Sequence, residues 1–307
     1  MSSNFRLKRL FAREQLAFLT RPRRGWGDHL ALAREFIGSA LQNADPTRSV
    51  LILGAGWGLE VPWKMAPIGT FGWDMDPLSR LGTWVRHRRR PPWVFDDLTG
   101  SFAELDRVAQ RVQVLEGVWA LRPAEAASRR LAGLVPSIPC SPRALEAWIG
   151  QYRPGAIICA NVLGQIKPMA HKIVEMAFKP RDPWVMDPDL ADPLQEALDA
   201  WVAKVVRAVL AVLGKSGATL HLLHDRGVIH EYADVSLGDW TDPWTKQIRT
   251  REKILGVSDP MPDIDVLEEL APRPCIEKKR WIWPLGPEQI HIVEAVSMGQ
   301  LVTPKPE

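Results

Sequence analysis

The chain has 307 residues, of which 46% are hydrophobic and 24% are charged. This balance is typical of a globular protein with a buried core, and it excludes a disordered, fibrous or coiled-coil chain. Lys and Arg number 39 against 36 Asp and Glu, so the net charge of +3 disfavours a protein that binds nucleic acid through its whole surface.

Residues 1–45 are predicted to be helical and to form an N-terminal extension, separate from a domain that covers residues 46–307. Asp28 is placed to cap the second helix, whose apolar face includes Phe36 and Leu41. Residues 1–24 mix basic and apolar side chains. We interpret this basic segment as a lid over a ligand site, with contact to anionic lipid or to RNA as the alternatives.

From residue 46 onward, short apolar segments alternate with helical ones. Strands are expected at 49–54, 69–74, 92–96, 154–160 and 217–223. Helices are expected near 58–66, 77–89, 142–151, 163–178 and 193–213. The last helix has Asp192 as its predicted N-cap and Pro193 at its first position. This alternation predicts an α/β fold with a parallel sheet and helices on both faces.

The end of the chain has a different pattern. Residues 280–283 and 289–293 are predicted to form two antiparallel strands, joined by a turn at 284–287. Irregular insertions at about 179–193 and 225–276 are expected to shape a substrate pocket. The expected architecture is therefore a mostly parallel sheet that ends in one antiparallel hairpin.

The three cysteines, Cys140, Cys159 and Cys275, lie far apart and form no CxxC pair. We therefore expect neither a disulfide framework nor a metal site. No uncharged apolar run approaches the roughly 18 residues that a membrane-spanning helix needs, and the N-terminus lacks the apolar block of a secretory signal. The expectation is a cytoplasmic protein without a transmembrane segment.

The most informative segment is the glycine-rich stretch Gly54-Ala55-Gly56-Trp57-Gly58, which follows the first strand. Glycines there allow a sharp turn and a close approach of the backbone to a ligand. The third glycine comes one residue earlier than in the dinucleotide fingerprint, which disfavours a pyrophosphate site. Asp74, twenty residues after Gly54, ends the second strand and can accept hydrogen bonds from both hydroxyls of a ribose. Taken singly, the loop also fits a plain tight turn, and Asp74 also fits a helix N-cap.

This series of strand, glycine loop, helix, strand and acidic residue resembles the class I S-adenosylmethionine-dependent methyltransferases, over about residues 28–224 and 280–294. The resemblance implies a Rossmann-like fold with a mostly parallel seven-stranded sheet, and S-adenosylmethionine as the cofactor. In that family the glycine loop faces the methionine part of the cofactor, and acids after the second and third strands lie near the ribose and the adenine. By resemblance, the cofactor-binding residues are Gly54, Ala55, Gly56, Trp57, Gly58, Asp74, Met75, Asp96, Asp97, Leu98 and Asn161.

Two acids follow the third strand, and Asp97 is preferred over Asp96 for the adenine. Segment 159–165, which contains Asn161 and Gln165, is similar to the family segment that closes over the cofactor and faces the substrate. For Asn161 and Gln165, capping and backbone hydrogen bonding within the loop is the alternative interpretation.

The chain departs from the family pattern at two positions. Ile52 stands where the family commonly has an acid, two residues before the first glycine, and Glu60 is a candidate to replace it. Gln165 stands where many relatives have His. No Asn-Pro-Pro-Tyr segment is present, which disfavours methylation of adenine or of a glutamine amide.

His224 and Asp225 lie at the end of the fifth predicted strand, where ligands of such sheets bind. His224 is the candidate general base, with Asn161 as a second catalytic candidate, and Gln165 and Asp225 are the candidate substrate ligands. The alternative for His224 is a histidine with a purely structural hydrogen bond. His221 and His224 are expected on opposite faces of the strand and therefore form no metal pair.

The sequence thus predicts methyl transfer from S-adenosylmethionine to a small-molecule acceptor rather than to a nucleic acid. A second hypothesis is a partner or regulatory module that binds the cofactor without transfer, motivated by Ile52 and Gln165. A third is an NAD(P)-dependent oxidoreductase, which the glycine spacing disfavours. A homo-oligomer or a protein partner is left open.

Overall fold

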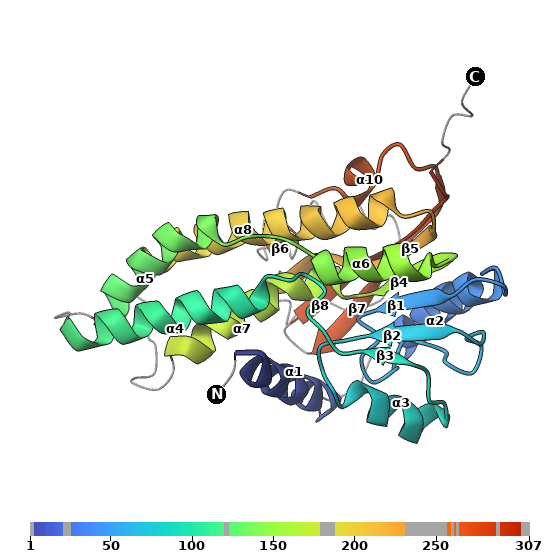
Figure 1. Ribbon diagram of the computed structural model, residues 1–307, viewed down its shortest axis with the longest axis horizontal. Coiled ribbons are helices and arrows are strands. Elements are labelled where there is room, and N and C mark those ends of the chain that lie inside the picture. Colours follow the sequence, from blue (N-terminus) through green and yellow to red (C-terminus); the bar gives the residue numbers. More distant parts are fainter. Residues whose placement is uncertain are drawn as a thin grey trace.

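The computed structural model describes residues 3–20, 26–119, 123–178, 188–230, 257–258, 261, 264–286 and 289–301. Within them, eight strands form one sheet (Figure 1). The strands are β1 (Val50–Leu53), β2 (Thr70–Trp73), β3 (Trp93–Val94), β4 (Ala156–Ala160), β5 (Thr219–His230), β6 (Val257–Ser258), β7 (Cys275–Gly286) and β8 (Gln289–Met298). Their order is β3-β2-β1-β4-β5-β8-β7, and β6 pairs with β5 outside this path.

The sheet combines a parallel part with an antiparallel end. β1 pairs in parallel with β2 and β4, β2 with β3, and β4 with β5. β8 runs antiparallel to both β5 and β7. This confirms the predicted α/β class and the C-terminal antiparallel hairpin. The order reverses at β1, which has β2 on one side and β4 on the other, and such a switch point opens a crevice at the carboxyl ends of the strands.

Helices cover both faces of the sheet. The helices are α1 (Ser3–Thr20), α2 (Trp26–Gln42), α3 (Ser79–His87), α4 (Phe102–Trp119), α5 (Pro123–Leu134), α6 (Arg143–Tyr152), α7 (Ile166–Phe178), α8 (Pro188–Lys215) and α10 (Val266–Glu269), with the 3-10 turns η1 (Val135–Ser137) and η2 (Leu163–Gln165). α4, α5, α7 and α8 pack on one another and extend beyond the sheet (Figure 1). No helix in the described ranges is both long and apolar enough to cross a membrane.

Alternating side chains divide the core into two layers. Leu51 and Leu53 pack toward the layer that contains α4, α7 and α8, whereas Val50 and Ile52 pack toward α2. Every residue of β1 and β4 is buried, as expected of strands covered on both sides. α2 contributes Phe36 to the second layer, so this helix packs against the sheet.

Several predicted boundaries differ from the structure. Residues 58–66 form turns rather than a helix, because Gly58 has a φ of +68° and Pro62 follows. α2 begins at Trp26, so Asp28 lies in its first turn instead of capping it. α8 begins at Pro188 rather than after Asp192, and Pro193 lies inside it.

The two predicted insertions are partly structured. The first overlaps α8 from residue 188, and its residues 179–187 lie outside the described residues. The second contains the end of β5, β6, α10 and the start of β7, and its residues 231–256 lie outside the described residues. β5 and β7 are longer than predicted because both pair with β8 along most of its length.

A buried arginine fixes the end of the sheet that lies opposite the crevice. Arg273 donates to the carbonyl oxygens of Gly214 (3.0 Å), Ala218 (2.7 Å) and Gly299 (2.9 Å), and also to those of Leu213 and Ser216. These carbonyls belong to the end of α8, the approach to β5 and the residue after β8. The guanidinium N–H groups thereby join the segment 213–218, from the end of α8 to the approach to β5, to the residue after β8, which is distant in sequence.

Candidate functional site

A cavity of about 460 Å³ lies at the carboxyl ends of β1 to β5. This is the crevice expected at the switch point of the sheet. Its lining includes most of the residues selected from the sequence, namely Gly54, Ala55, Gly56, Trp57, Gly58, Asp74, Met75, Asp96, Asp97, Leu98, Asn161, Gln165 and Asp225. The structure therefore brings these residues together in one hollow, with His224 as the exception.

The glycine loop has a backbone that only glycine adopts easily. Gly54 and Gly58 each have a φ of +68°. A Cβ at Gly54 would lie 2.5 Å from the Cβ of Val162, and one at Gly58 would lie 2.8 Å from the ring of Trp63. Both positions therefore require glycine for conformation and for space. The result is a loop whose backbone faces the cavity directly.

Asp74 ties this loop to the end of β2. The backbone N–H of Gly56 donates to Asp74 Oδ2, and that of Asp76 donates to Oδ1, both at 2.8 Å. Burial raises the pKa of Asp74 to about 6, and the neighbouring carboxylate of Asp76 raises it further while these hydrogen bonds oppose the shift. Each carboxylate oxygen keeps a lone pair, so Asp74 can still accept hydrogen bonds from a ligand in the cavity.

The two acids after β3 have different roles. Asp97 accepts hydrogen bonds from Thr99 N (2.9 Å), Thr99 Oγ1 (2.6 Å), Ser101 N (3.0 Å) and Phe102 N (2.8 Å), so its carboxylate shapes the start of α4. Asp96 is exposed at the cavity and accepts only from the N–H of Asp97 among the described residues. The geometry therefore leaves the carboxylate of Asp96, rather than that of Asp97, available to a ligand in the cavity, whereas the sequence led to a preference for Asp97.

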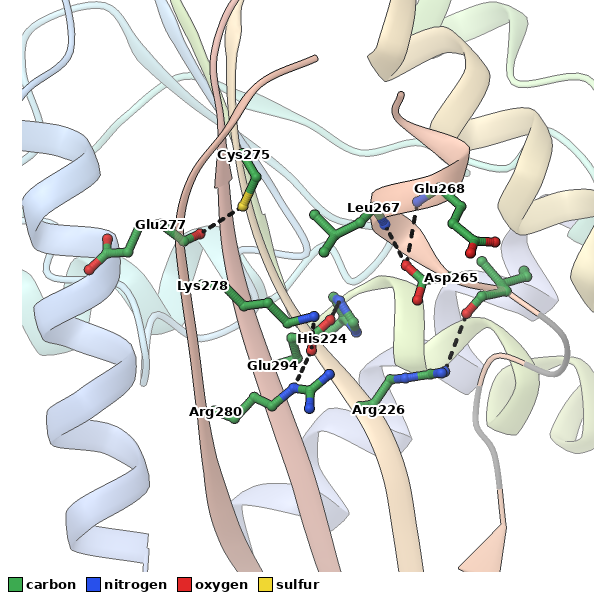
Figure 2. Close-up of polar contacts among 11 residues, drawn as sticks. His224, Arg226, Asp265, Leu267, Glu268, Cys275, Glu277, Lys278, Arg280 and Glu294 are labelled. Atoms are coloured by element: carbon green, nitrogen blue, oxygen red, sulfur yellow. Dashed lines mark hydrogen bonds and ion pairs between the residues drawn. The ribbon is translucent and has the colours of Figure 1, made fainter. Parts of the chain in front are cut away.

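His224 lies behind the cavity wall. Successive residues of a strand point to opposite faces, and Asp225 takes the side of the cavity. The His224 ring is 0% exposed, and its Nε2 lies 3.7 Å from Glu294 Oε1 (Figure 2). Glu294 also pairs with Lys278 at 3.0 Å and with Arg280. Burial lowers the pKa of His224. The role of a base that touches substrate does not fit His224, because its ring cannot reach a ligand in the cavity.

The histidine that does line this part of the cavity is His291, which the sequence analysis did not select. Its Nδ1 lies 2.9 Å from Asp225 Oδ2. The ring packs against Trp283, with ring centres 5.3 Å apart. The alternating segment 289–293 already placed His291 on the opposite face from Ile290 and Ile292, so a signal for it was present.

Asn161 ends β4 beside this pair. It has a φ of +56° and is buried, and its backbone N–H donates to Leu223 O at 2.8 Å. Gln165 is exposed within η2 at the cavity. A Cβ on Gly164 would lie 3.1 Å from the Cβ of Asp225, so η2 packs closely against the Asp225 side chain.

A chain of hydrogen bonds orients a further carboxylate in the cavity. Trp281 Nε1 donates to His29 Nδ1 at 3.0 Å, which leaves the proton of the neutral ring on Nε2. That nitrogen lies 3.2 Å from Glu60 Oε1 and donates to it. Glu60 lines the cavity next to the glycine loop, where it can take the place of the acid that Ile52 does not supply.

The N-terminal helix forms another wall. Phe11, Glu14 and Gln15 of α1 line the cavity, and Glu14 pairs with Lys172 of α7. Gln15 lies 3.7 Å from the position that a Cβ on Gly56 would take. α1 therefore lies beside the glycine loop at the cavity.

The described residues contain no group of three or more His, Cys, Asp or Glu side chains suited to hold a metal ion. A scan against models of protein families found no family that matches this chain, and a search of curated proteins found no match either.

Proposed function

We propose that this protein binds S-adenosylmethionine in the cavity and transfers the methyl group to a small molecule. The observation that carries the proposal is the link between the glycine loop and Asp74. The loop is held in left-handed conformations, and the backbone N–H of Gly56 donates at 2.8 Å to Asp74 Oδ2, at the end of the next strand. This places backbone and carboxylate on one wall of a cavity, as a nucleoside ligand requires.

The residues of the cavity fit the parts of this cofactor. Asp74 is mostly ionised at neutral pH, because its pKa is about 6, and it can accept from the ribose hydroxyls. Asp96 offers an exposed carboxylate to the adenine amino group, and Glu60 offers one to the amino group of the methionine part. The volume of about 460 Å³ falls in the usual range of small-molecule sites, roughly 300–1,000 Å³.

The fold also supports the proposal. A strand order that runs β3-β2-β1-β4-β5 and then continues into an antiparallel pair agrees with the seven-stranded sheet that the family resemblance implies. β6, a short strand at the edge of β5, is an addition to that plan.

The bound cofactor would supply a methyl group carried on a positively charged sulfur. The chain then has to hold the acceptor in line with that methyl group and to exclude water, and close positioning alone gives a large acceleration. α1 and η2 enclose the cavity, and Asn161 and Asp225 lie on the wall where the acceptor would rest.

The test is calorimetry with S-adenosylmethionine and S-adenosylhomocysteine, followed by a search for methylated products in a metabolite extract. Asp74→Ala should weaken binding by about 1.5–3 kcal/mol, because a charged acceptor is lost. Asp28→Ala, an exposed acid on α2, is the matched control and should bind as the wild type does. Absence of binding by the wild type would refute the proposal.

A cofactor-binding module without transfer is the second candidate. Ile52, at the position where an acid is common in the family, is fully buried against α2 and cannot contact a ligand. Tight binding of S-adenosylhomocysteine without turnover on any fraction of the extract would favour this module over the enzyme.

A further inference from the structure

Three buried polar side chains on the acceptor wall of the cavity have unused hydrogen-bonding atoms. Asn161, Asp225 and His291 are 6%, 1% and 6% exposed. Asn161 Oδ1, Asp225 Oδ1 and both ring nitrogens of His291 have no hydrogen-bond partner among the residues that the structure describes. Native proteins leave few buried polar atoms unpaired, so such a concentration in one cavity indicates a polar ligand.

The contact between Asp225 and His291 fixes what the histidine can do. Asp225 Oδ2 lies 2.9 Å from Nδ1 in an ion-pair contact that does not have the geometry of a hydrogen bond, and the nearby carboxylate favours the tautomer of the neutral ring with its proton on Nδ1. Nε2 then has a lone pair and acts as an acceptor. Trp283 packs against the ring, and the close approach of Gly164 limits movement of Asp225. A histidine oriented by a carboxylate is the arrangement of a general base.

The cations of the cavity are already paired. Lys167 lies 2.9 Å from Asp199 Oδ2, and Lys172 pairs with Glu14. The acceptor wall itself contributes the carboxylate of Asp225. Within the described part of the lining, a phosphate or carboxylate group would therefore meet a negative charge without a spare cation, which disfavours an anionic acceptor.

We infer that Asp225 and His291 form the acid–base pair of the acceptor site, and that the acceptor is a neutral small molecule with a phenol-type hydroxyl. This inference rests on the proposed function. The hydroxyl proton moves to His291 Nε2, and the electron pair of the O–H bond stays on the acceptor oxygen. The carboxylate of Asp225 balances the charge of the imidazolium, which returns its proton to water after the product leaves. Asn161 Oδ1 accepts from a second donor on the acceptor.

The acidity of the acceptor follows from the use of a base. An aromatic amine attacks through a lone pair that it already has, so its first step needs no proton acceptor, and an aliphatic amine is a cation at neutral pH rather than a neutral acceptor. A phenol is acidic enough for an imidazole to take its proton, whereas an aliphatic alcohol is far weaker as an acid. Aromatic residues that line the cavity, Trp283 among them, suit the ring of such a compound.

The probe for this inference is 4-nitrophenol, whose ionised form is yellow. With protein saturated by S-adenosylhomocysteine in mildly acidic buffer, the wild type should raise the phenolate fraction of the bound probe. Asp225→Asn and His291→Gln should lower that fraction at least about tenfold. His224→Gln is the matched control, because it changes the neighbouring buried histidine outside the cavity, and it should leave the spectrum unchanged. Melting curves show whether each variant is folded.

A second readout needs neither probe nor cofactor. NMR of protein labelled with ¹⁵N in the histidine rings reports which ring nitrogen carries the proton. The His291 signals are identified as those that disappear in His291→Gln, and they should show the proton on Nδ1. Asp225→Asn should remove that preference. A proton on Nε2 in the wild type, or a probe that stays neutral, overturns the inference. Calorimetry separates the two proposals. Absence of S-adenosylhomocysteine binding would refute the proposed cofactor, whereas the tautomer of the His291 ring tests its role as a base independently.

Discussion

Acidification should weaken the binding of S-adenosylhomocysteine through Asp74. The pKa of this carboxyl is raised to about 6, chiefly by burial, and under the proposed function a ribose hydroxyl donates to the ionised form. At about pH 5 only about one tenth of Asp74 is ionised, so the affinity should fall by about tenfold, or about 1.4 kcal/mol, relative to neutral pH.

Calorimetry from about pH 5 to about pH 8 measures this dependence. Asp74→Asn keeps one acceptor oxygen but does not titrate, so its affinity should be lower at the upper end of the range and nearly constant across it. Asp28→Asn, the exposed control, should retain the slope of the wild type. A wild-type affinity that does not change with pH, or an equal slope in Asp74→Asn, would show that Asp74 does not hold the ligand.

The free protein provides an independent check of the same carboxyl. Its folded-state pKa lies above the ordinary value of 3.8, so its contribution to folding is present below about pH 4 and is lost as the pH rises through about 6. The free energy of unfolding of the wild type, minus that of Asp74→Asn, should therefore fall by up to about 3 kcal/mol between these pH values. Urea unfolding measures the difference, and a constant value would contradict the assigned burial.

Three further predictions concern single positions. Gly54→Ala should lower the free energy of unfolding by about 2–4 kcal/mol, because Gly54 has a φ of +68° and an added Cβ would contact Val162. Gly133→Ala, at a position with open space around it, should raise the free energy of unfolding by up to about 1 kcal/mol. Equal effects of the two substitutions in urea unfolding would refute the strain at Gly54. Asp97→Ala should lower the free energy of unfolding by about 1–2 kcal/mol and leave ligand binding intact. Asp96→Ala should weaken ligand binding by about 1 kcal/mol and leave the melting temperature unchanged. The opposite pattern in calorimetry would show that Asp97 is the ligand-binding residue. Arg273→Lys should cost about 3–5 kcal/mol in urea unfolding, because an ammonium cannot serve the same carbonyl groups, and a loss below about 1 kcal/mol would contradict this role.

Part of the fold could be predicted because each inner strand has a local signal. Val50–Leu53 and Ala156–Ala160 are short apolar runs, and both are buried along their whole length. The glycine loop and Asp74 could also be predicted, because a tight turn and the acid at the end of the next strand depend on residues close in sequence. No helix was predicted over 102–134, although the spacing of Leu105, Ala109 and Val112 marks the buried side of α4.

The acceptor side of the cavity depends on contacts that no local pattern contains. The alternation of side chains along β5 determines that Asp225, and not His224, faces the cavity. The register of β8 against β5 determines the position of His291. The register shifts between Asp225 and Gly227, so that Val228 lies opposite His291. The role of Asp97 is local instead, because its four hydrogen bonds come from residues 99–102, just before and at the start of α4, where no helix was predicted.

The position of β8 has a consequence for how the molecule assembles. This strand lies between β5 and β7 and follows both of them in the sequence. During synthesis, β5 and β7 are therefore complete before β8, and the edges that pair with β8 in the folded protein stay unpaired until β8 is made. Unpaired strand edges can pair with other chains, so the nascent protein is most prone to aggregation before β8 has paired with β5 and β7. Asp225 and His291 come together only when β8 has paired with β5, so this part of the cavity is among the last to be completed.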